Sequence, residues 1–453
     1  MTEKGKDERT ARMERVIATC LEVLRRDPRN WAAYHDMGVA YMELGRFAQA
    51  AEAFDHAHDL NRRDIDGLHL AGVALAEAGD YDRAISRWKE VVKANPGHAA
   101  SRYFLGKTYA LKGMWDAAIH ELRKSIEAEP EARPPLAYVH LGEVYLARGK
   151  LEAAISAWEK ARDLDPDDPR IRVNLGAAYL DAGRFEDALV ESGEAVRLGA
   201  RTATAELNRG LALMRLGRVQ EAIEAYDRAI ALDLRDPEPY LNQGEAYLAR
   251  GNLDRAVEVW RKALEVRPGY ADAHHNLGVA LFRQGRTEEA LAEWRQALEL
   301  SPRHRPARIN LAAAFTRLGR YDEALAEWKT LLEGQENNPD ILANLSEVYT
   351  RKGDLDLAAD YARQAVIASP AHPRAQFVLG VALARRGEAR EALDAWRKSV
   401  SRSPDFLVSQ GPTVRACLDD VTLKVLEREA RKSSNPSDAG LVQTIRALKE
   451  PAR

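Results

Sequence analysis

A period of 34 residues constrains this chain more than any other feature of its sequence. Repeats with the same pattern begin at residues 31, 65, 99, 135, 169, 203, 237, 271, 305, 339 and 373, and only the repeat at 99 is longer, at 36 residues. The eleven repeats cover 376 of the 453 residues. Such self-similarity predicts one small structural element that is copied and stacked, rather than the three separate domains that the length alone would suggest.

Each repeat is predicted to fold into two α-helices. Apolar residues recur at i, i+3, i+4 and i+7 on both sides of a glycine that occupies the fifteenth position of every repeat, from Gly45 to Gly387. Glycine is suited to end a helix because it adopts a positive φ without steric cost. We therefore expect an all-α solenoid of tandem helix pairs.

The remaining fixed positions predict close packing within each pair. A second glycine occupies the eighth position in nine repeats, with Ala312 and Ser346 in the other two. Alanine is invariant at the twentieth position, and a large aromatic residue follows four residues later in eight repeats. Small residues facing large ones allow two helices to interdigitate. Proline closes many repeats, Pro130 and Pro404 among them, and prevents the second helix from continuing.

This combination of period, Leu-Gly-x-x-Tyr, turn glycine, alanine, aromatic residue and closing proline resembles the tetratricopeptide repeat family. The resemblance implies a right-handed superhelix whose first helices line a concave groove. The groove resembles that of the superhelical domain of O-GlcNAc transferases, although the catalytic domain of those enzymes is missing. The ninth position of the repeats is never asparagine, which departs from family members that clamp the C-termini of chaperones.

The resemblance and the apolar patterns together predict three segments. Residues 1–30 carry one apolar stripe, from Met13 to Leu24, and are expected to form an N-terminal capping helix. Residues 31–406 are the eleven repeats. Residues 407–453 are expected to form a C-terminal capping helix and a short tail. The apolar residues expected in that cap are Val414, Leu418, Val421, Val425 and Leu426.

The charge and cysteine content argue against several classes of partner. Lys and Arg number 67 against 70 Asp and Glu, so there is no basic excess for nucleic acid or an anionic membrane. No run of about 18 apolar residues could insert into a membrane. The two cysteines, Cys20 and Cys417, are far apart and show no metal-binding spacing. We expect them to be buried thiols of a cytoplasmic protein.

We find no catalytic or cofactor-binding motif. Residues 101–108 end like a phosphate-binding loop, but the first glycine is Ser101, and the segment falls inside a predicted helix. His35, His69 and His275 share the fifth position of their repeats, and packed helices would hold them roughly 10 Å apart, too far for a common metal. We expect these histidines to be solvated. The sequence predicts neither an enzyme nor a metal or cofactor site.

Six consecutive repeats carry asparagine at the sixth position of the first helix. A side-chain amide can donate to and accept from a peptide backbone whatever its sequence. By resemblance to the O-GlcNAc transferases, such a row grips an extended polypeptide. The alternative interpretation is that asparagine helps neighbouring helices to pack, and the sequence does not decide between the two. The residues are Asn174, Asn208, Asn242, Asn276, Asn310 and Asn344.

Apolar and basic residues are predicted to flank this asparagine row in the groove. An arginine at regular spacing suits a carboxylate, although a cation near the C-terminus of a helix also complements the helix dipole. The arginines, at the thirteenth position, are Arg215, Arg283, Arg317, Arg351 and Arg385. The apolar candidates are Val139, Leu146, Val173, Leu180, Leu207, Leu211, Met214, Leu241, Leu248 and Phe282.

These patterns predict a non-enzymatic scaffold or adaptor. Its groove would bind an extended segment of another protein, apolar in the middle and acidic toward the rear. The alternative hypothesis is a self-assembling structural protein that forms homo-oligomers through its convex face or its ends.

Overall fold

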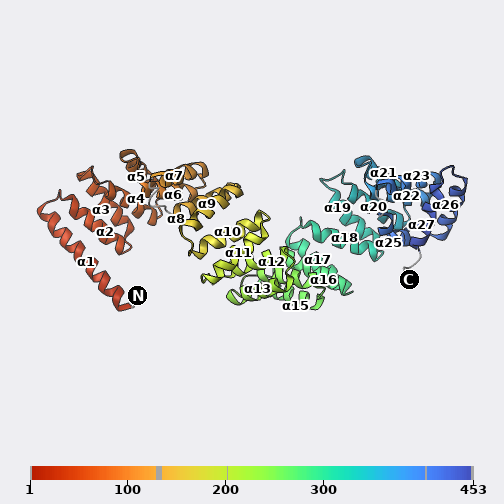
Figure 1. Cartoon of the computed structure of the whole chain (residues 1–453), viewed down its shortest axis with the longest axis horizontal. Coiled ribbons are helices and arrows are strands. Elements are labelled where there is room, and N and C mark those ends of the chain that lie inside the picture. The colour runs from red at the N-terminus through yellow and green to blue at the C-terminus, as the bar shows by residue number, and fades with distance from the viewer. Residues whose placement is uncertain (1–2, 129–134, 201, 403–405, 450–453) are drawn as a thin grey trace. The chain divides into compact units, whose positions relative to one another are not determined.

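The computed structural model describes residues 3–128, 135–200, 202–402 and 406–449. The described residues form α-helices joined by short turns, with no β-strand in those ranges. The predicted all-α solenoid of tandem helix pairs is thereby confirmed (Figure 1). The contacts divide the chain into an N-terminal unit, Met1–Asp233, and a C-terminal unit, Leu234–Arg453.

The N-terminal unit consists of one long helix followed by helix pairs. Its helices are α1 (Glu3–Arg26), α2 (Trp31–Glu43), α3 (Phe47–Leu60), α4 (Ile65–Glu77), α5 (Tyr81–Ala94), α6 (Ala99–Leu111), α7 (Trp115–Ala128), α8 (Pro135–Ala147), α9 (Leu151–Leu164), α10 (Pro169–Asp181), α11 (Phe185–Arg197), α12 (Ala203–Arg215) and α13 (Val219–Leu232). Even-numbered helices from α2 onward are the first helices of their repeats.

The C-terminal unit continues the pairs and ends in shorter helices. Its helices are α14 (Glu238–Ala249), α15 (Leu253–Val266), α16 (Ala271–Arg283), α17 (Thr287–Leu300), α18 (Arg305–Arg317), α19 (Tyr321–Leu332), α20 (Pro339–Lys352), α21 (Leu355–Ala368), α22 (Pro373–Arg386), α23 (Ala389–Arg402), α24 (Phe406–Ser409), α25 (Gly411–Cys417), α26 (Asp420–Lys432) and α27 (Ser437–Lys449).

The chain turns between the two helices of each pair at the predicted glycine. In all eleven repeats this glycine has a positive φ, between 70° and 97°. At Gly45 a Cβ atom would meet nothing within 4 Å, so backbone conformation and not space requires glycine there. At Gly353 the N–H also donates to the carbonyls of Tyr349 and Thr350, which closes the end of α20.

The glycine at the eighth position is required for space. A Cβ atom on Gly244 would lie 2.3 Å from Nε1 of Trp260 on the paired helix. Trp260 is fully buried, and its Nε1–H donates to the carbonyl of Leu241 at 3.0 Å. The predicted close approach of the two helices is therefore a contact between glycine and an indole ring. The same contact joins Gly72 to Trp88, Gly142 to Trp158, Gly278 to Trp294 and Gly380 to Trp396.

One repeat shows what happens without this glycine. Ala312 occupies the eighth position, and the indole of Trp328 forms a different hydrogen bond. Its Nε1 lies 3.5 Å from the hydroxyl of Thr316, whereas the other indoles bond to the main chain at 3.0–3.1 Å. The methyl group thus moves the indole to a poorer partner while leaving it buried.

In several repeats, a charged residue at the fourth position links the first helix to the second helix and to the preceding turn. Arg308 donates to Glu327 on the second helix at 2.6 Å and to the carbonyl of Pro302 in the preceding turn at 2.9 Å. Both charged side chains are mostly buried, which makes this pair more stabilising than an exposed one. Sequence reasoning missed this arrangement. It recurs for Arg102 with Glu121 and Pro96, Arg172 with Glu191 and Pro166, and His274 with Glu293 and Pro268.

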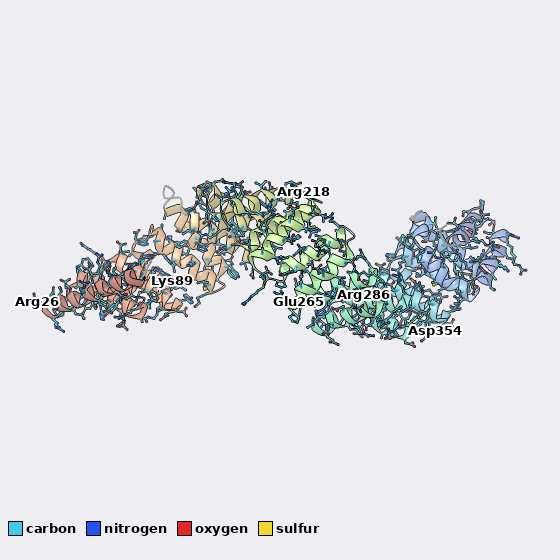
Figure 2. All side chains as sticks on the ribbon, turned by 90° about the horizontal axis from the view of Figure 1, so that it is seen from below. Arg26, Lys89, Arg218, Glu265, Arg286 and Asp354 are labelled. Atoms are coloured by element: carbon cyan, nitrogen blue, oxygen red, sulfur yellow. The ribbon has the colours of Figure 1, made fainter. Side chains whose placement is uncertain are left out.

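Elsewhere the outer charges form exposed pairs. Arg218 pairs with Glu221 and Arg286 with Glu289, each at 2.6 Å and within one helical turn. Figure 2 labels the two arginines. Such pairs contribute little to stability, and they keep the outer surface hydrated.

The C-terminal cap departs from its predicted pattern. A helix break after α25 lets Asp419 cap α26 by accepting the N–H of Thr422 at 2.7 Å. The break changes the helical phase, so Val421 and Val425 are 71% and 43% exposed although we expected them in the core of the cap. The other three expected residues, Val414, Leu418 and Leu426, are buried, and Leu423 is buried in place of the two valines.

Helix α27 packs against α23, α25 and α26 and completes this end of the chain. Leu441, Val442 and Ile445 are buried in the shared core, so the segment up to Lys449 docks on the helices before it. Pro130, Pro404 and the last four residues, about which the sequence makes predictions, lie outside the described residues.

Candidate functional site

The first helices of the C-terminal unit present one common face. Positions two, six, nine and thirteen follow one another at spacings of four and three residues, which places them on one side of a helix. On α16 and α18 the residues at positions six, nine and thirteen are half-buried or exposed, whereas those at positions seven, eight and ten are buried. We define the first-helix face as Asn276, Val279, Arg283, Asn310, Ala313 and Arg317.

Two asparagines of this face belong to a hydrogen-bonded chain. Asn310 Nδ2 on α18 donates to His275 Nε2 on α16 at 3.0 Å. His275 Nδ1 lies 3.1 Å from Asn276 Oδ1, and Asn276 Nδ2 donates to a carboxylate oxygen of Glu245 on α14 at 3.1 Å. This series of hydrogen bonds links three successive first helices. It leaves each amide with further hydrogen-bonding capacity, including one free N–H.

The other four asparagines differ in their partners. Asn208 Nδ2 donates to the carbonyl of Val173 on α10 at 3.3 Å, and Asn242 donates to a carbonyl of its own helix at 2.8 Å. Asn344 accepts from an arginine of α22, whereas Asn174 makes no hydrogen bond within the described part of the chain. Contacts between neighbouring first helices therefore support a packing role for part of the row.

Three of the predicted arginines are exposed to solvent. Arg215 and Arg283 have no ion pair or hydrogen bond to any described residue. Arg317 lies over the ring of Phe282, with its guanidinium carbon 5.1 Å from the ring centroid, and has no carboxylate partner in the described ranges. Arg283 and Arg317 occupy equivalent positions on neighbouring helices of the first-helix face.

The last two arginines of the predicted row are not free for a partner. Arg385 donates to the carbonyl of Cys417 at the end of α25, at 2.6 Å, and Arg351 donates to Glu347 at 2.6 Å. The reason is that α25 contacts α20 as well as α22, so the C-terminal segment covers this part of the first helices. The helix end, with its carbonyl dipoles, takes the place predicted for an acidic ligand.

The predicted apolar residues lie between helices more than on an open surface. Leu241, Leu248 and Phe282 pack against the buried core of the C-terminal unit. Of the ten predicted apolar residues, Leu146 is 42% exposed and the other nine are half-buried. The nine are Val139, Val173, Leu180, Leu207, Leu211, Met214, Leu241, Leu248 and Phe282.

Sequence reasoning missed exposed apolar residues of the N-terminal unit. Leu111 is 64% exposed at the thirteenth position of α6, where other repeats carry a charge or alanine. Val39 and Leu136 are exposed at the ninth and second positions of their repeats. A comparison of each surface position across all repeats would have found them.

The histidines that we expected to be solvated are bonded to neighbouring residues. His69 Nδ1 lies 2.8 Å from the hydroxyl of Ser101, and its ring lies 5.1 Å from that of His98. Burial, followed by the charge of His98, lowers the pKa of His69 to about 4. The expectation of solvation is wrong because the next repeat covers this position.

A second histidine pair has the same form. The rings of His275 and His304 lie 5.1 Å apart. His304 Nδ1 accepts the N–H of Ala307 and so caps α18, while its Nε2 lies 3.0 Å from Asp272. Burial and the neighbouring His304 lower the pKa of His275.

Within the described residues, no group of three or more His, Cys, Asp or Glu side chains is arranged to hold a metal ion, and no helix is long and apolar enough to cross a membrane. Both cysteines are free and buried, as predicted. Burial raises the pKa of the Cys417 thiol to about 12, so it is not an activated nucleophile.

The fold and the recurring contacts can now be compared with known proteins. A family model described as the cilia and flagella-associated protein 70 C-terminal domain matches residues 65–313, more than half of the chain. Three tetratricopeptide repeat models match residues 31–64, 281–346 and 343–405. The chain belongs to the tetratricopeptide repeat family. Proteins with this repeat generally mediate interactions between proteins.

Solved tetratricopeptide repeat structures are also similar to parts of the chain. MamA is 30% identical over 36% of this chain and 95% of its own, with a TM-score of 0.34. YrrB, described as a tetratricopeptide repeat protein with an unusual peptide-binding site, is 25% identical over 41% of this chain and 95% of its own, with a TM-score of 0.35. A chain of the Cut9–Hcn1 complex is 13% identical over 92% of this chain and 93% of its own, with a TM-score of 0.40. No curated protein matches the chain.

Proposed function

We propose that this tetratricopeptide repeat protein is a non-enzymatic scaffold that binds an extended, acidic polypeptide segment across the first-helix face. The observation that carries the proposal is the pair Arg283 and Arg317. Both are exposed on neighbouring first helices, and neither has a carboxylate partner among the described residues. Two guanidinium groups in one row can each form paired, charge-assisted hydrogen bonds with a carboxylate.

The amides of Asn276 and Asn310 supply the backbone contacts in this proposal. Packed helices lie about 10 Å apart, and an extended chain advances about 3.3 Å per residue. A segment crossing the helices would therefore meet one asparagine at about every third residue. The unused donor of each amide can bond to a peptide carbonyl without regard to side-chain identity.

The surface between the asparagines and the arginines is apolar. Val279 and Ala313 are half-buried at the ninth positions, and the ring of Phe282 supports Arg317. A partner with small apolar residues between its acidic ones would fit this strip. In the N-terminal unit, α12 carries the same two residue types, but only Arg215 is exposed, because Asn208 is buried against Val173.

Charge reversal of the two arginines tests the proposal. Arrays of twelve-residue peptides, acidic, neutral and basic, would be screened against the full chain, and the strongest acidic peptide measured by fluorescence anisotropy. The double variant R283E/R317E should weaken this peptide by about tenfold or more, because two attractive contacts become repulsive.

The matched control is the double variant R303E/R390E. Arg303 and Arg390 are exposed, unpaired within the described ranges and outside the first-helix face, so this control makes the same change in net charge. It should bind nearly as well as the unmodified chain. Equal weakening by the two double variants, or no preference of the unmodified chain for acidic peptides, would contradict the proposal.

A further inference from the structure

The hydrogen-bonded chain through His275 fixes the protonation state of that residue. Nε2 accepts from Asn310, so it carries no proton, and Nδ1 faces the Asn276 oxygen, so it carries one. The neutral ring with its proton on Nδ1 is the only form that satisfies both bonds. The same ring orientation directs the Asn276 amide so that its nitrogen donates to Glu245.

His304 is constrained in the opposite sense. Its Nδ1 accepts the N–H of Ala307 and carries no proton, and its Nε2 faces Asp272 and carries one. Asn310 lies on the helix that His304 caps. Both histidines must therefore be neutral for the amides of the first-helix face to be held as they are.

The charged groups around His275 come from three first helices. Asp272 of α16 favours its protonation, whereas His304 of α18 and the burial of the ring oppose it. Glu245 of α14 lies one hydrogen bond further, beyond Asn276. Burial and His304 together outweigh Asp272, so the pKa of His275 lies below its usual value.

A second proton on His275 would break the hydrogen bond from Asn310 to Nε2 in its present direction. It would place an N–H at Nε2, facing the N–H of Asn310, and two donors cannot bond to each other. Rotating the Asn310 amide by half a turn would restore a bond, with its oxygen accepting from Nε2. Beside the neutral ring, Asn310 offers a polypeptide its oxygen and one N–H, and after this rotation it would offer only N–H donors.

We infer that His275 is a positioning residue, which sets the orientation of the Asn310 and Asn276 amides and makes polypeptide binding across the first-helix face sensitive to acid. This inference rests on the proposed function. Its direct basis is local to two repeats, since the other asparagines of the row bond to main-chain carbonyls or arginine, or to no described residue. Mild acid should therefore weaken binding through Asn310 and not through the whole row.

The first test needs no ligand. The full chain, labelled with nitrogen-15 on histidine rings and asparagine amides, would be followed by NMR between pH 7.5 and 5. The His275 ring should show its proton on Nδ1 at pH 7.5, and the Asn310 amide signals should shift with the midpoint of His275. Unchanged Asn310 signals while His275 titrates would overturn the inference.

The variant His275→Leu separates positioning from folding. Leucine already occupies the fifth position in two earlier repeats, as Leu207 and Leu241, so the change is compatible with packing. The matched control is His69→Leu, which removes the corresponding histidine beside His98 in the N-terminal unit. The pH-dependent shift of Asn310 should disappear in the first variant and persist in the control.

Binding supplies the second readout. The acidic peptide selected on the unmodified chain should bind more weakly at pH 5.5 than at pH 7.5, by less than about tenfold, because His275, with its pKa below 6.5, is only partly protonated at pH 5.5. His275→Leu should show little of this pH dependence, and His69→Leu should retain it. Equal pH dependence in all three chains would overturn the inference. If no acidic peptide binds at pH 7.5, the proposed function fails while the NMR result still decides the role of His275.

Discussion

At the scale of single residues, two glycines per repeat serve different ends. The turn glycine is needed for its positive φ, whereas the eighth-position glycine makes room for a side chain of the paired helix, an indole ring in five repeats. The sequence shows that both recur, and their reasons become distinct only when the neighbouring atoms are known. Substitutions at the two kinds of position therefore fail for different reasons.

Gly244→Ala should destabilise the C-terminal unit. The added methyl group would lie within 2.3–2.7 Å of the Trp260 indole, and overpacking of this kind typically costs about 1–3 kcal/mol. The matched control is Gly193→Ala in α11, where an added Cβ meets nothing within 4 Å. That control should gain up to about 1 kcal/mol from helix propensity. Hydrogen exchange of the affected helices would report both changes, and equal behaviour of the two variants would argue against the indole contact.

The burial of His69 makes the N-terminal unit sensitive to acid. Its pKa is about 4 in the folded chain and near 6.5 when unfolded, so between these values the unfolded state binds the extra proton. Stability should therefore fall as the pH is lowered from 6.5 toward 4, by up to about 3 kcal/mol. The free energy of opening of α4–α6, from hydrogen exchange corrected for intrinsic rates, measures this loss.

His69→Leu should reduce that pH dependence. The exposed His120 of α7 provides the control, because His120→Leu makes the same substitution at an exposed ring of the same unit. A pH profile of His69→Leu that coincides with that of the unmodified chain would show that another group is responsible.

At the scale of helices, local signals were enough to predict the pairs but not the covering of their surfaces. A helix pair needs only its own apolar stripe and turn glycine, both contained within 34 residues. Arg317 and Arg351 hold the same position in similar repeats, yet Arg317 is exposed and Arg351 is covered. The difference comes from α25, which lies more than 60 residues beyond Arg351 in the chain and whose packing no local pattern records.

The same limit explains the histidines and the C-terminal cap. His69 bonds to Ser101, a residue of the next repeat, and the stripe from Val414 to Leu426 is divided by the capping carboxylate of Asp419. The asparagine row was recognisable from the sequence, whereas the link through His275 depends on three helices meeting. The position of a residue within its repeat predicts which side chains share a helix face. Contacts between repeats decide which of those side chains are still available to a partner.

At the scale of the whole molecule, one helix near each end of the array bears on the hypothesis of self-assembly through the ends. On α1 the exposed Arg25 and Arg26, the latter labelled in Figure 2, form no ion pair with a described residue. On α26 the same is true of Lys424, Arg428 and Arg431. Helices with unpaired cations repel one another, so stacking of one copy's end on another's is disfavoured at low salt.

The chain should therefore be a monomer at about 100 µM and low ionic strength. Light scattering over a concentration series would give the mass, with 50.5 kDa expected for one chain. Association that strengthens as salt is lowered would contradict this expectation and favour a charge-driven assembly.

The covering of Arg385 by the carbonyl of Cys417 also limits how this protein can lengthen by duplication of its repeats. A copied repeat inserted between α4 and α19 would bring its own turn glycine and would meet a helix pair of the same form on either side. A copy inserted after α23 would separate Arg385 from Cys417 and α20 from α25. Gain or loss of repeats is thus accommodated in the interior of the array, while the final two repeats and the C-terminal helices are inherited as one block.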